Sequence, residues 1–218
     1  MNIHKTAILN RAVPGSGKTS MTRCIVSFLE SHGIACRVHS TDDYFMVDGR
    51  YVFDVSRLYE YHIRNLEAFK GSLAAAIPIV ICDNTNIHPW ETEPYTDAAR
   101  AMGYRILFLD FPPRPLAQHR ESQIVSDRKP DAHEVPDDSL VEFIRDFHVY
   151  DSLLDPDMPV DPVLHRRFEW SDAAQNAVDS GIPAKHFDAD AVRMVHPEMF
   201  SEEKVRVPAL VFDFVTKK

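Results

Sequence analysis

The sequence contains few cysteines, no long hydrophobic run and a shortage of basic residues. Its three cysteines, Cys24, Cys36 and Cys82, lie far apart in apolar stretches and show no metal-binding or redox spacing, which predicts core thiols in a reducing cytosol. No segment is long enough to span a bilayer. The first residues do not resemble a signal peptide, because the apolar run behind them is too short. We therefore expect a cytoplasmic protein without a membrane partner.

The charge balance bears on the ligands that the protein could bind. Acidic residues outnumber basic residues 33 to 24, which leaves a net charge of −9. Long nucleic acids require basic surfaces, so this balance weakens the case for a polynucleotide ligand without excluding a small basic groove. A hydrophobic content of 44% in 218 residues is enough for one large domain, or for one domain with a tail.

A strand, a glycine-containing loop and a helix follow one another between residues 7 and 33. Residues 7–9 are apolar, residues 12–19 (AVPGSGKT) resemble a Walker A loop, and an amphipathic stretch then runs to residues 32–33. Such a loop binds phosphate through backbone N–H groups and the positive end of the helix dipole. The predicted phosphate-binding residues are Pro14, Gly15, Ser16, Gly17, Lys18, Thr19 and Ser20.

Two residues of the loop would have specific roles, and a third position departs from the motif. Lys18 would reach the outer phosphates of a nucleotide, and Thr19 would ligate magnesium. The first glycine of the motif is replaced by Ala12. A methyl group is tolerated at this position only if the backbone there has a negative φ.

Strands alternate with helices along the first two thirds of the chain. The pattern predicts strands at 34–40, 77–82 and 104–110, helices at 55–75 and 89–103, and further helices that begin near residues 116 and 137. This alternation predicts an α/β fold with a mostly parallel sheet that is covered on both faces. After residue 155 the regularity falls, apart from a strand expected at 165–170 and a strand pair between 205 and 215. We therefore expect a domain of residues 1–154 and a C-terminal extension, 155–218, packed on it.

Polar residues follow the ends of the predicted strands, where parallel sheets bind their ligands. Asp42 could accept a proton from an attacking hydroxyl, or it could cap a turn. Asp83 resembles an acid that orients magnesium, although a strand-end turn would also place an acid there. Around these two acids, the residues expected to contact substrate are Asp43, Tyr44, Asn84, Thr85 and Asn86.

Several of these side chains have a structural interpretation as well. Residues 84–86 could equally well form a turn whose polar groups are already hydrogen-bonded within the protein. Tyr44 belongs to an aromatic cluster with residues 45, 51 and 53, which could stack a base or cover the edge of the sheet. Arg120 and Arg128 lie in or beside a polar segment at 126–136, which we expect to be mobile. Cations on such a flap could close over a transferring phosphoryl group, whereas most surface arginines are only solvated.

Together these motifs resemble the polynucleotide-kinase-like branch of the P-loop ATPases. The resemblance covers about residues 6–154 and rests on PGSGKT at 14–19, STDDYF at 40–45, GRYVF at 49–53, CDNTN at 82–86, WE at 90–91 and HEVP at 133–136. It implies a three-layer P-loop NTPase fold with the P-loop strand central, ATP and Mg²⁺ as cofactors, and a lid segment that carries an arginine. By position, Asp42 would be the general base, and Arg120 or Arg128 would be the lid arginine.

One position departs from the phage-type polynucleotide kinases of that branch. Those enzymes follow their Asp-Asp-Tyr motif with an arginine that contacts the acceptor phosphate, whereas this chain has Phe45. Our leading hypothesis is an ATP-dependent kinase that transfers the γ-phosphoryl group to a hydroxyl acceptor. The acceptor could be a polynucleotide 5′ end, a nucleotide, a sugar or another small alcohol, and a zeta-toxin-like kinase is a related form. The alternative is an ATP-binding or ATPase switch module that acts through a protein partner.

Overall fold

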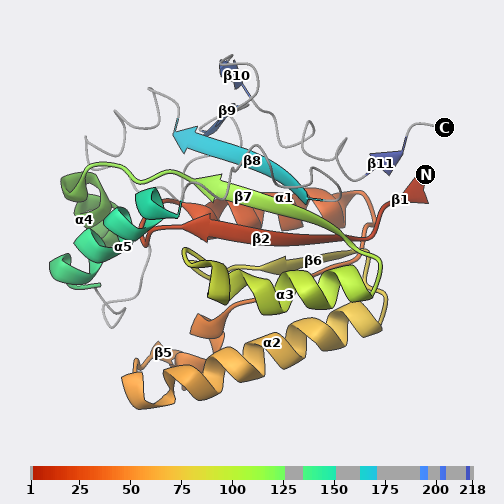
Figure 1. The fold of residues 1–218 in the computed structure, drawn as a ribbon, viewed down its shortest axis with the longest axis horizontal. Helices are drawn as coiled ribbons and strands as arrows, with labels where there is room; N and C mark the ends of the chain where they lie inside the picture. Colours follow the sequence, from red (N-terminus) through yellow and green to blue (C-terminus); the bar gives the residue numbers. More distant parts are fainter. Residues whose placement is uncertain are drawn as a thin grey trace.

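The computed structural model describes residues 2–125 and 135–150, together with four strands at 163–170, 192–195, 202–204 and 215–216. The main sheet consists of β2 (Thr6–Ala12), β3 (Cys36–His39), β6 (Ile79–Cys82), β7 (Arg105–Phe111), β8 (Val163–Trp170), β9 (Val192–Val195) and β10 (Glu202–Lys204). Its strand order is β10-β9-β8-β7-β2-β6-β3 (Figure 1). The strands from β8 to β3 run parallel, whereas β9 is antiparallel to both of its neighbours.

Helices cover both faces of this sheet. They are α1 (Lys18–Ser31), α2 (Leu58–Ala74), α3 (Pro89–Ala101), α4 (Leu116–Val125) and α5 (Asp137–Val149), with 3-10 turns η1 (Thr41–Phe45) and η2 (Val55–Arg57). Two short strand pairs complete the described elements: β1 (Asn2–Ile3) with β11 (Val215–Thr216), and β4 (Met46–Val47) with β5 (Arg50–Tyr51). Because α1 packs on one face and α2 and α3 on the other, the predicted three-layer α/β fold is confirmed.

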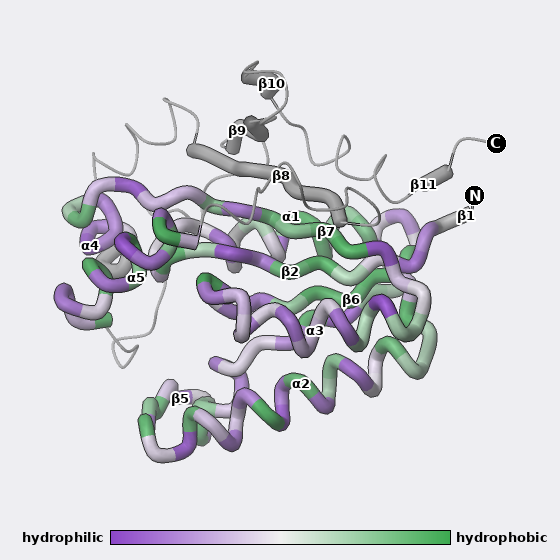
Figure 2. The backbone as a smooth tube through the Cα atoms, in the orientation of Figure 1, coloured by the Kyte–Doolittle hydropathy of each residue, from purple (hydrophilic) through white to green (hydrophobic). Residues whose placement is uncertain are grey.

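Successive residues of the central strand β2 contribute to two different cores. Ile8 packs with Ile25 and Leu29 of α1, whereas Leu9 lies in the cluster that contains Phe69 of α2 and Tyr95 of α3. All residues of β2 are buried. Figure 2 shows hydrophobic residues along the central strands and a hydrophilic stretch where β2 approaches the P-loop. The core therefore packs the central strand on both faces, and the polar residues Asn10 and Arg11 lie near its carboxyl end.

Local sequence explains where the helices begin and end. α1 stops before His32, because Gly33 adopts the left-handed conformation with φ 68°. α3 starts with Pro89, and the carboxylate of Glu91 accepts a 2.8 Å hydrogen bond from the backbone N–H of His88. The end of α1 and the start of α3 both agree with the sequence prediction.

The later part of the chain extends the sheet. The strand predicted at 165–170 is β8, which runs parallel to β7, so this prediction is confirmed. The helix predicted from residue 137 is α5, which ends at Val149. The segment 126–134 and most of the strand pair predicted between 205 and 215 lie outside the described residues. Among the described helices, none combines the length and the hydrophobicity that a bilayer-spanning segment needs.

Candidate active site

The P-loop connects β2 to α1 at the carboxyl edge of the sheet. Gly15 (φ 81°) and Gly17 (φ 88°) adopt the left-handed conformation that the sharp turn requires. Ala12 ends β2 in extended backbone opposite Phe111, so the methyl group that replaces the first glycine of the motif meets the negative φ it needs. The hydroxyl of Ser16 is buried and has no hydrogen-bond partner among the described residues, which suits a loop built to hold a polar ligand.

A histidine that we did not predict braces this loop. His119 on α4 is fully buried, and its Nδ1 lies 2.9 Å from the carbonyl oxygen of Pro14. Its Nε2 accepts the backbone N–H of Arg114 at 2.9 Å. This second bond requires an unprotonated Nε2, so the ring proton resides on Nδ1 and is donated to Pro14. Burial, with a contribution from the charge of Arg114, lowers the pKa of His119 to about 4 and keeps the ring neutral.

The guanidinium of Arg114 forms a second brace. It donates to the carbonyl oxygen of Gly15 at 2.5 Å and to the hydroxyl of Ser122 at 2.8 Å. In a trans peptide the C=O group and the following N–H group point in opposite directions. Holding the carbonyl of Pro14 outward therefore turns the N–H of Gly15 inward, where a phosphate oxygen could accept it. The sequence carried no local signal for these contacts, because they join α4 and the turn before it to a loop about a hundred residues earlier.

The residues that could hold a metal lie on the other side of the loop. The hydroxyl of Thr19 is 3.4 Å from the ammonium group of Lys18. Asp83, at the end of β6, is buried, and its carboxylate accepts a 2.7 Å hydrogen bond from the side-chain amide of Asn10. The amide of Asn10 also lies 2.7 Å from the hydroxyl of Thr22. Asn10, which sequence reasoning missed, thus orients the acid. Ser20 lies in α1, but its side chain is outside the described residues.

These oxygens fit a nucleotide-bound magnesium ion. Among the described residues, no cluster of three or more His, Cys, Asp and Glu side chains could hold a metal by itself. Mg²⁺ that binds together with phosphates usually needs only one or two protein oxygens. Thr19 and Asp83 line one cleft and could supply these two.

Asp42 faces this cleft from η1. The cap of η1 is the hydroxyl of Ser40, which accepts the backbone N–H of Asp42 at 3.3 Å, so the carboxylate of Asp42 is not used for capping. Instead it accepts a 3.0 Å hydrogen bond from the hydroxyl of Tyr51. The pKa of the neighbouring Asp43 is raised by desolvation and by the carboxylates of Asp42 and Asp83. The acids of η1 and β6 are therefore close enough to influence one another.

The stretch 84–86 holds the edge of the sheet together. Asn84 is buried and accepts the backbone N–H of Thr41 at 2.9 Å, which anchors the start of η1. The carbonyl of Thr85 accepts the backbone N–H of Ala12 at 2.8 Å. Asn86 has φ 49° and donates from its side chain to the carbonyl of Asn10 at 2.7 Å. These contacts tie the stretch to β2 and η1, and its contact with a substrate stays a prediction.

The aromatic residues at the end of η1 pack on α2. Phe45 is buried, with ring centroids 4.7 Å from Tyr61 and 5.0 Å from Phe53. Tyr44 is half-buried, and the guanidinium of Arg64 lies 4.7 Å from its ring. Phe45 therefore occupies a core position, which explains why an apolar residue follows the Asp-Asp-Tyr motif in this chain.

The two arginines predicted for a lid have different outcomes. Arg120 on α4 forms a bidentate ion pair with Asp137 at the start of α5, so the structure joins the two helices through this side chain. Arg128 lies outside the described residues. The described part of the chain therefore places neither arginine in the cleft.

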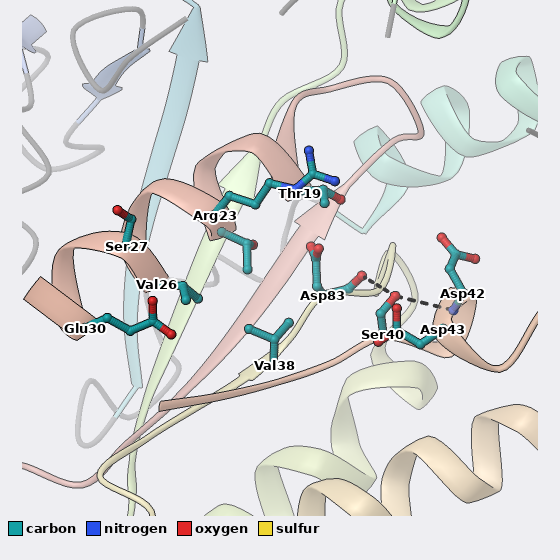
Figure 3. A pocket seen from close by; sticks show the side chains of 11 residues that line it. Thr19, Arg23, Val26, Ser27, Glu30, Val38, Ser40, Asp42, Asp43 and Asp83 are labelled. Atoms are coloured by element: carbon teal, nitrogen blue, oxygen red, sulfur yellow. Dashed lines mark hydrogen bonds between the residues drawn. The ribbon is translucent and has the colours of Figure 1, made fainter. Parts of the chain in front are cut away.

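A cleft of about 450 Å³ unites the candidate groups (Figure 3). It lies between α1, the end of β3 and η1, and it contains Thr19, Asp42, Asp43 and Asp83. The sequence predicted that these residues would converge, because each follows a parallel strand. Figure 3 also shows Arg23 of α1 in this cleft, a residue that sequence reasoning did not select.

Comparison with known proteins finds relatives that share part of the sequence and solved structures that share the fold. No protein-family profile matches the chain. NEDD4-binding protein 2 from Homo sapiens is 36% identical over 117 residues, which are 51% of this chain but only 6% of that protein. The AvrRxo1-ORF1:-ORF2 complex with ATP has a TM-score of 0.58 at 16% identity, over 97% of this chain and 63% of that chain. The Pnkp1/Rnl/Hen1 RNA repair complex has a TM-score of 0.51 at 12% identity, over 70% and 47%.

Identities this low establish the fold alone. The chain spans less than two thirds of the length of these relatives. Its own geometry agrees with them, because a P-loop follows the central strand of a parallel sheet that helices cover on both faces. The chain therefore has a P-loop NTPase fold.

Proposed function

We propose that this protein is a P-loop kinase that transfers the γ-phosphoryl group of Mg-ATP to a hydroxyl acceptor. The observation that carries the proposal is the placement of Asp42 in one cleft with Thr19 and Asp83. The P-loop, Thr19 and Asp83 provide the nucleotide side of such a site, and Asp42 provides a carboxylate that is not used for capping. The motif resemblance to the polynucleotide-kinase-like branch supports the same reaction.

Each residue has a role in this reaction. The P-loop N–H groups and Lys18 bind the phosphates, and Thr19 and Asp83 hold Mg²⁺, which neutralises charge on the phosphate oxygens. Asp42 accepts the proton of the acceptor hydroxyl while the acceptor oxygen bonds to the γ-phosphorus. The bond from that phosphorus to the bridging oxygen breaks and ADP leaves, after which Asp42 releases its proton to water. Tyr51 orients the carboxylate of Asp42.

Different observations favour different acceptors. The motif resemblance to the polynucleotide-kinase-like branch supports a polynucleotide 5′-hydroxyl, and one structural neighbour belongs to an RNA repair complex. The cleft itself is acidic, with Glu30, Asp42, Asp43 and Asp83 against one arginine, which disfavours a polyanion. Its volume of about 450 Å³ suits a small alcohol, a sugar or a nucleotide.

A second candidate function is an ATP-dependent switch that acts through a protein partner. It is favoured by apolar side chains exposed on the β4–β5 hairpin and the start of α2, namely Met46, Val47, Val52, Phe53, Val55, Tyr59 and Ile63. The AvrRxo1-ORF1 neighbour is itself found in a complex with ORF2. A switch would bind and hydrolyse ATP without phosphorylating a second molecule.

The experiment that separates these candidates follows labelled γ-phosphate from Mg-ATP. Acceptors would include DNA and RNA oligonucleotides with 5′-hydroxyl ends, nucleosides, nucleotide sugars and simple sugars, with Lys18→Ala as the control. Label on one acceptor class that disappears in Lys18→Ala would establish the kinase and name its substrate. Bound Mg-ATP without transfer to any acceptor would contradict the kinase and favour the switch.

A further inference from the structure

Among the described residues that line the cleft, one is a cation and four are acids. Arg23 of α1 lines it together with the carboxylates of Asp42, Asp43 and Asp83 (Figure 3). In the described part of the chain, neither Lys18 nor Arg120 lines this space. Among the described residues, Arg23 is therefore the one cation that lines the cleft in which phosphoryl transfer is proposed.

The position of Arg23 on the helix directs its side chain to the metal side of the P-loop. Residues four apart lie on the same helix face, and helical side chains lean toward the N-terminus. Arg23 follows Thr19 by four residues, so its side chain runs back along α1 toward Thr19, as Figure 3 shows. The rise between the two residues is about 6 Å, a length that an extended arginine side chain can span.

The guanidinium of Arg23 has no bonding partner among the described residues. In the part of the chain that the structure describes, it forms no ion pair and no hydrogen bond, although acids line the same cleft. Other arginines are paired, as Arg100 is with Asp97 and Arg120 with Asp137. An unpaired guanidinium beside Thr19 can therefore receive an anionic ligand without first breaking a protein contact.

We propose that Arg23 binds the γ-phosphate of Mg-ATP and stabilises the charge on the phosphoryl group as it transfers. This inference rests on the proposed kinase function, and it assigns to α1 the role that the sequence had suggested for Arg120 or Arg128. A planar guanidinium can donate two parallel hydrogen bonds to phosphate oxygens. The ADP product lacks the γ-phosphate, so it lacks this contact.

The affinities for ATP and ADP test the inference without knowledge of the acceptor. Isothermal titration calorimetry with Mg²⁺ would give both dissociation constants for the wild type, Arg23→Gln and Arg23→Lys. A charge-assisted hydrogen bond predicts that Arg23→Gln weakens ATP binding roughly 10- to 100-fold and ADP binding less than about 3-fold. Arg23→Lys should retain part of the preference for ATP, because lysine keeps the positive charge but cannot donate two parallel hydrogen bonds.

The matched control is Arg37→Gln. Arg37 is an exposed arginine on β3 that does not line the cleft, so its loss changes the net charge equally. It should leave the ratio of the two affinities unchanged. An unchanged ratio in Arg23→Gln, with the wild type still binding ATP, would overturn this inference and leave the kinase proposal intact. Failure of the wild type to bind Mg-ATP would overturn both.

Discussion

The side-chain amide of Asn10 donates a 2.7 Å hydrogen bond to the carboxylate of Asp83 across 73 residues of sequence. Asn10 lies on β2 just before the P-loop, and Asp83 directly follows the neighbouring strand β6. The bond occupies Oδ1 of Asp83 and so directs the carboxylate. A buried amide thereby orients the acid proposed to hold magnesium, much as outer partners orient metal ligands in other proteins.

Replacement of this amide should affect the magnesium-dependent part of nucleotide binding. We expect Asn10→Ala to lower the free energy of unfolding by about 1–3 kcal/mol, because Asp83 and Thr22 lose a buried donor. We also expect the variant to bind ATP more weakly than the wild type in a buffer with Mg²⁺. In a buffer with EDTA, which removes Mg²⁺, the two proteins should bind ATP with similar affinity. Titration calorimetry in the two buffers, with chemical unfolding, would measure both effects.

Asn65→Ala is the matched control for Asn10→Ala. Asn65 is equally buried and donates a 2.9 Å hydrogen bond to the hydroxyl of Tyr95, away from the cleft. It should destabilise the protein similarly while leaving the effect of Mg²⁺ on ATP affinity intact. Equal loss of the magnesium effect in both variants would refute a specific role for Asn10.

Asp42→Asn should separate catalysis from binding. A general base contributes typically 10²- to 10⁴-fold to the rate, so kcat for phosphoryl transfer should fall by about that factor. The dissociation constant of Mg-ATP should stay within about threefold of the wild type, because Asp42 is assigned to the acceptor hydroxyl rather than to the nucleotide. Asp43→Asn serves as the neighbouring control and should retain more activity. Unchanged turnover in Asp42→Asn would favour the switch.

His119 should make the stability depend on pH. Its pKa is lowered to about 4 in the folded protein from an ordinary value of 6.5, so between these values the unfolded chain binds more protons. Stability therefore decreases as the pH falls through this window and levels off below about pH 4. Urea unfolding should give a free energy about 2 kcal/mol lower at pH 5 than at pH 7 from this residue alone.

His119→Asn isolates this contribution. Asparagine can still donate to the carbonyl of Pro14 but does not titrate in this range. The pKa values of His39 and His62 are also lowered, mainly by desolvation, and their contributions remain in both proteins. The difference in pH slope between the wild type and His119→Asn therefore reports His119. Identical slopes would argue against a neutral, buried ring.

A buried ion pair joins the P-loop strand to its neighbour. Arg11 and Asp110 are both about 1% exposed, their charged atoms are 3.7 Å apart, and the guanidinium lies 4.1 Å from the ring of Phe147 on α5. Arg11→Met should reduce the free energy of unfolding by about 3–5 kcal/mol, because it removes one partner of a buried ion pair and leaves the carboxylate of Asp110 buried. Chemical unfolding would measure the loss.

The double variant Arg11→Met with Asp110→Leu tests the cause of that loss. Removal of both charges also removes the cost of burying the carboxylate of Asp110, so the double variant should be more stable than Arg11→Met alone. A double variant that is less stable than the single one would show that packing rather than charge dominates.

Much of the fold could be predicted because its signals are local. The apolar run at 7–9, the loop at 12–19 and the helix that ends near Gly33 identified β2, the P-loop and α1. The regular alternation of strands and helices led to the parallel sheet, and parallel strands bring their carboxyl ends to one edge. The shared placement of Thr19, Asp42 and Asp83 followed from this rule.

The contacts that tune the site were decided only by the tertiary structure. Asn10 meets Asp83, His119 meets Pro14, and the guanidinium of Arg120 turns to Asp137. Periodicity indicates which face of an element is buried, but it does not say which distant side chain will lie opposite. The sequence by itself thus determined the P-loop, the order of the elements and the edge that carries the site. Long-range packing determined which side chains contact the P-loop and which cation lines the cleft.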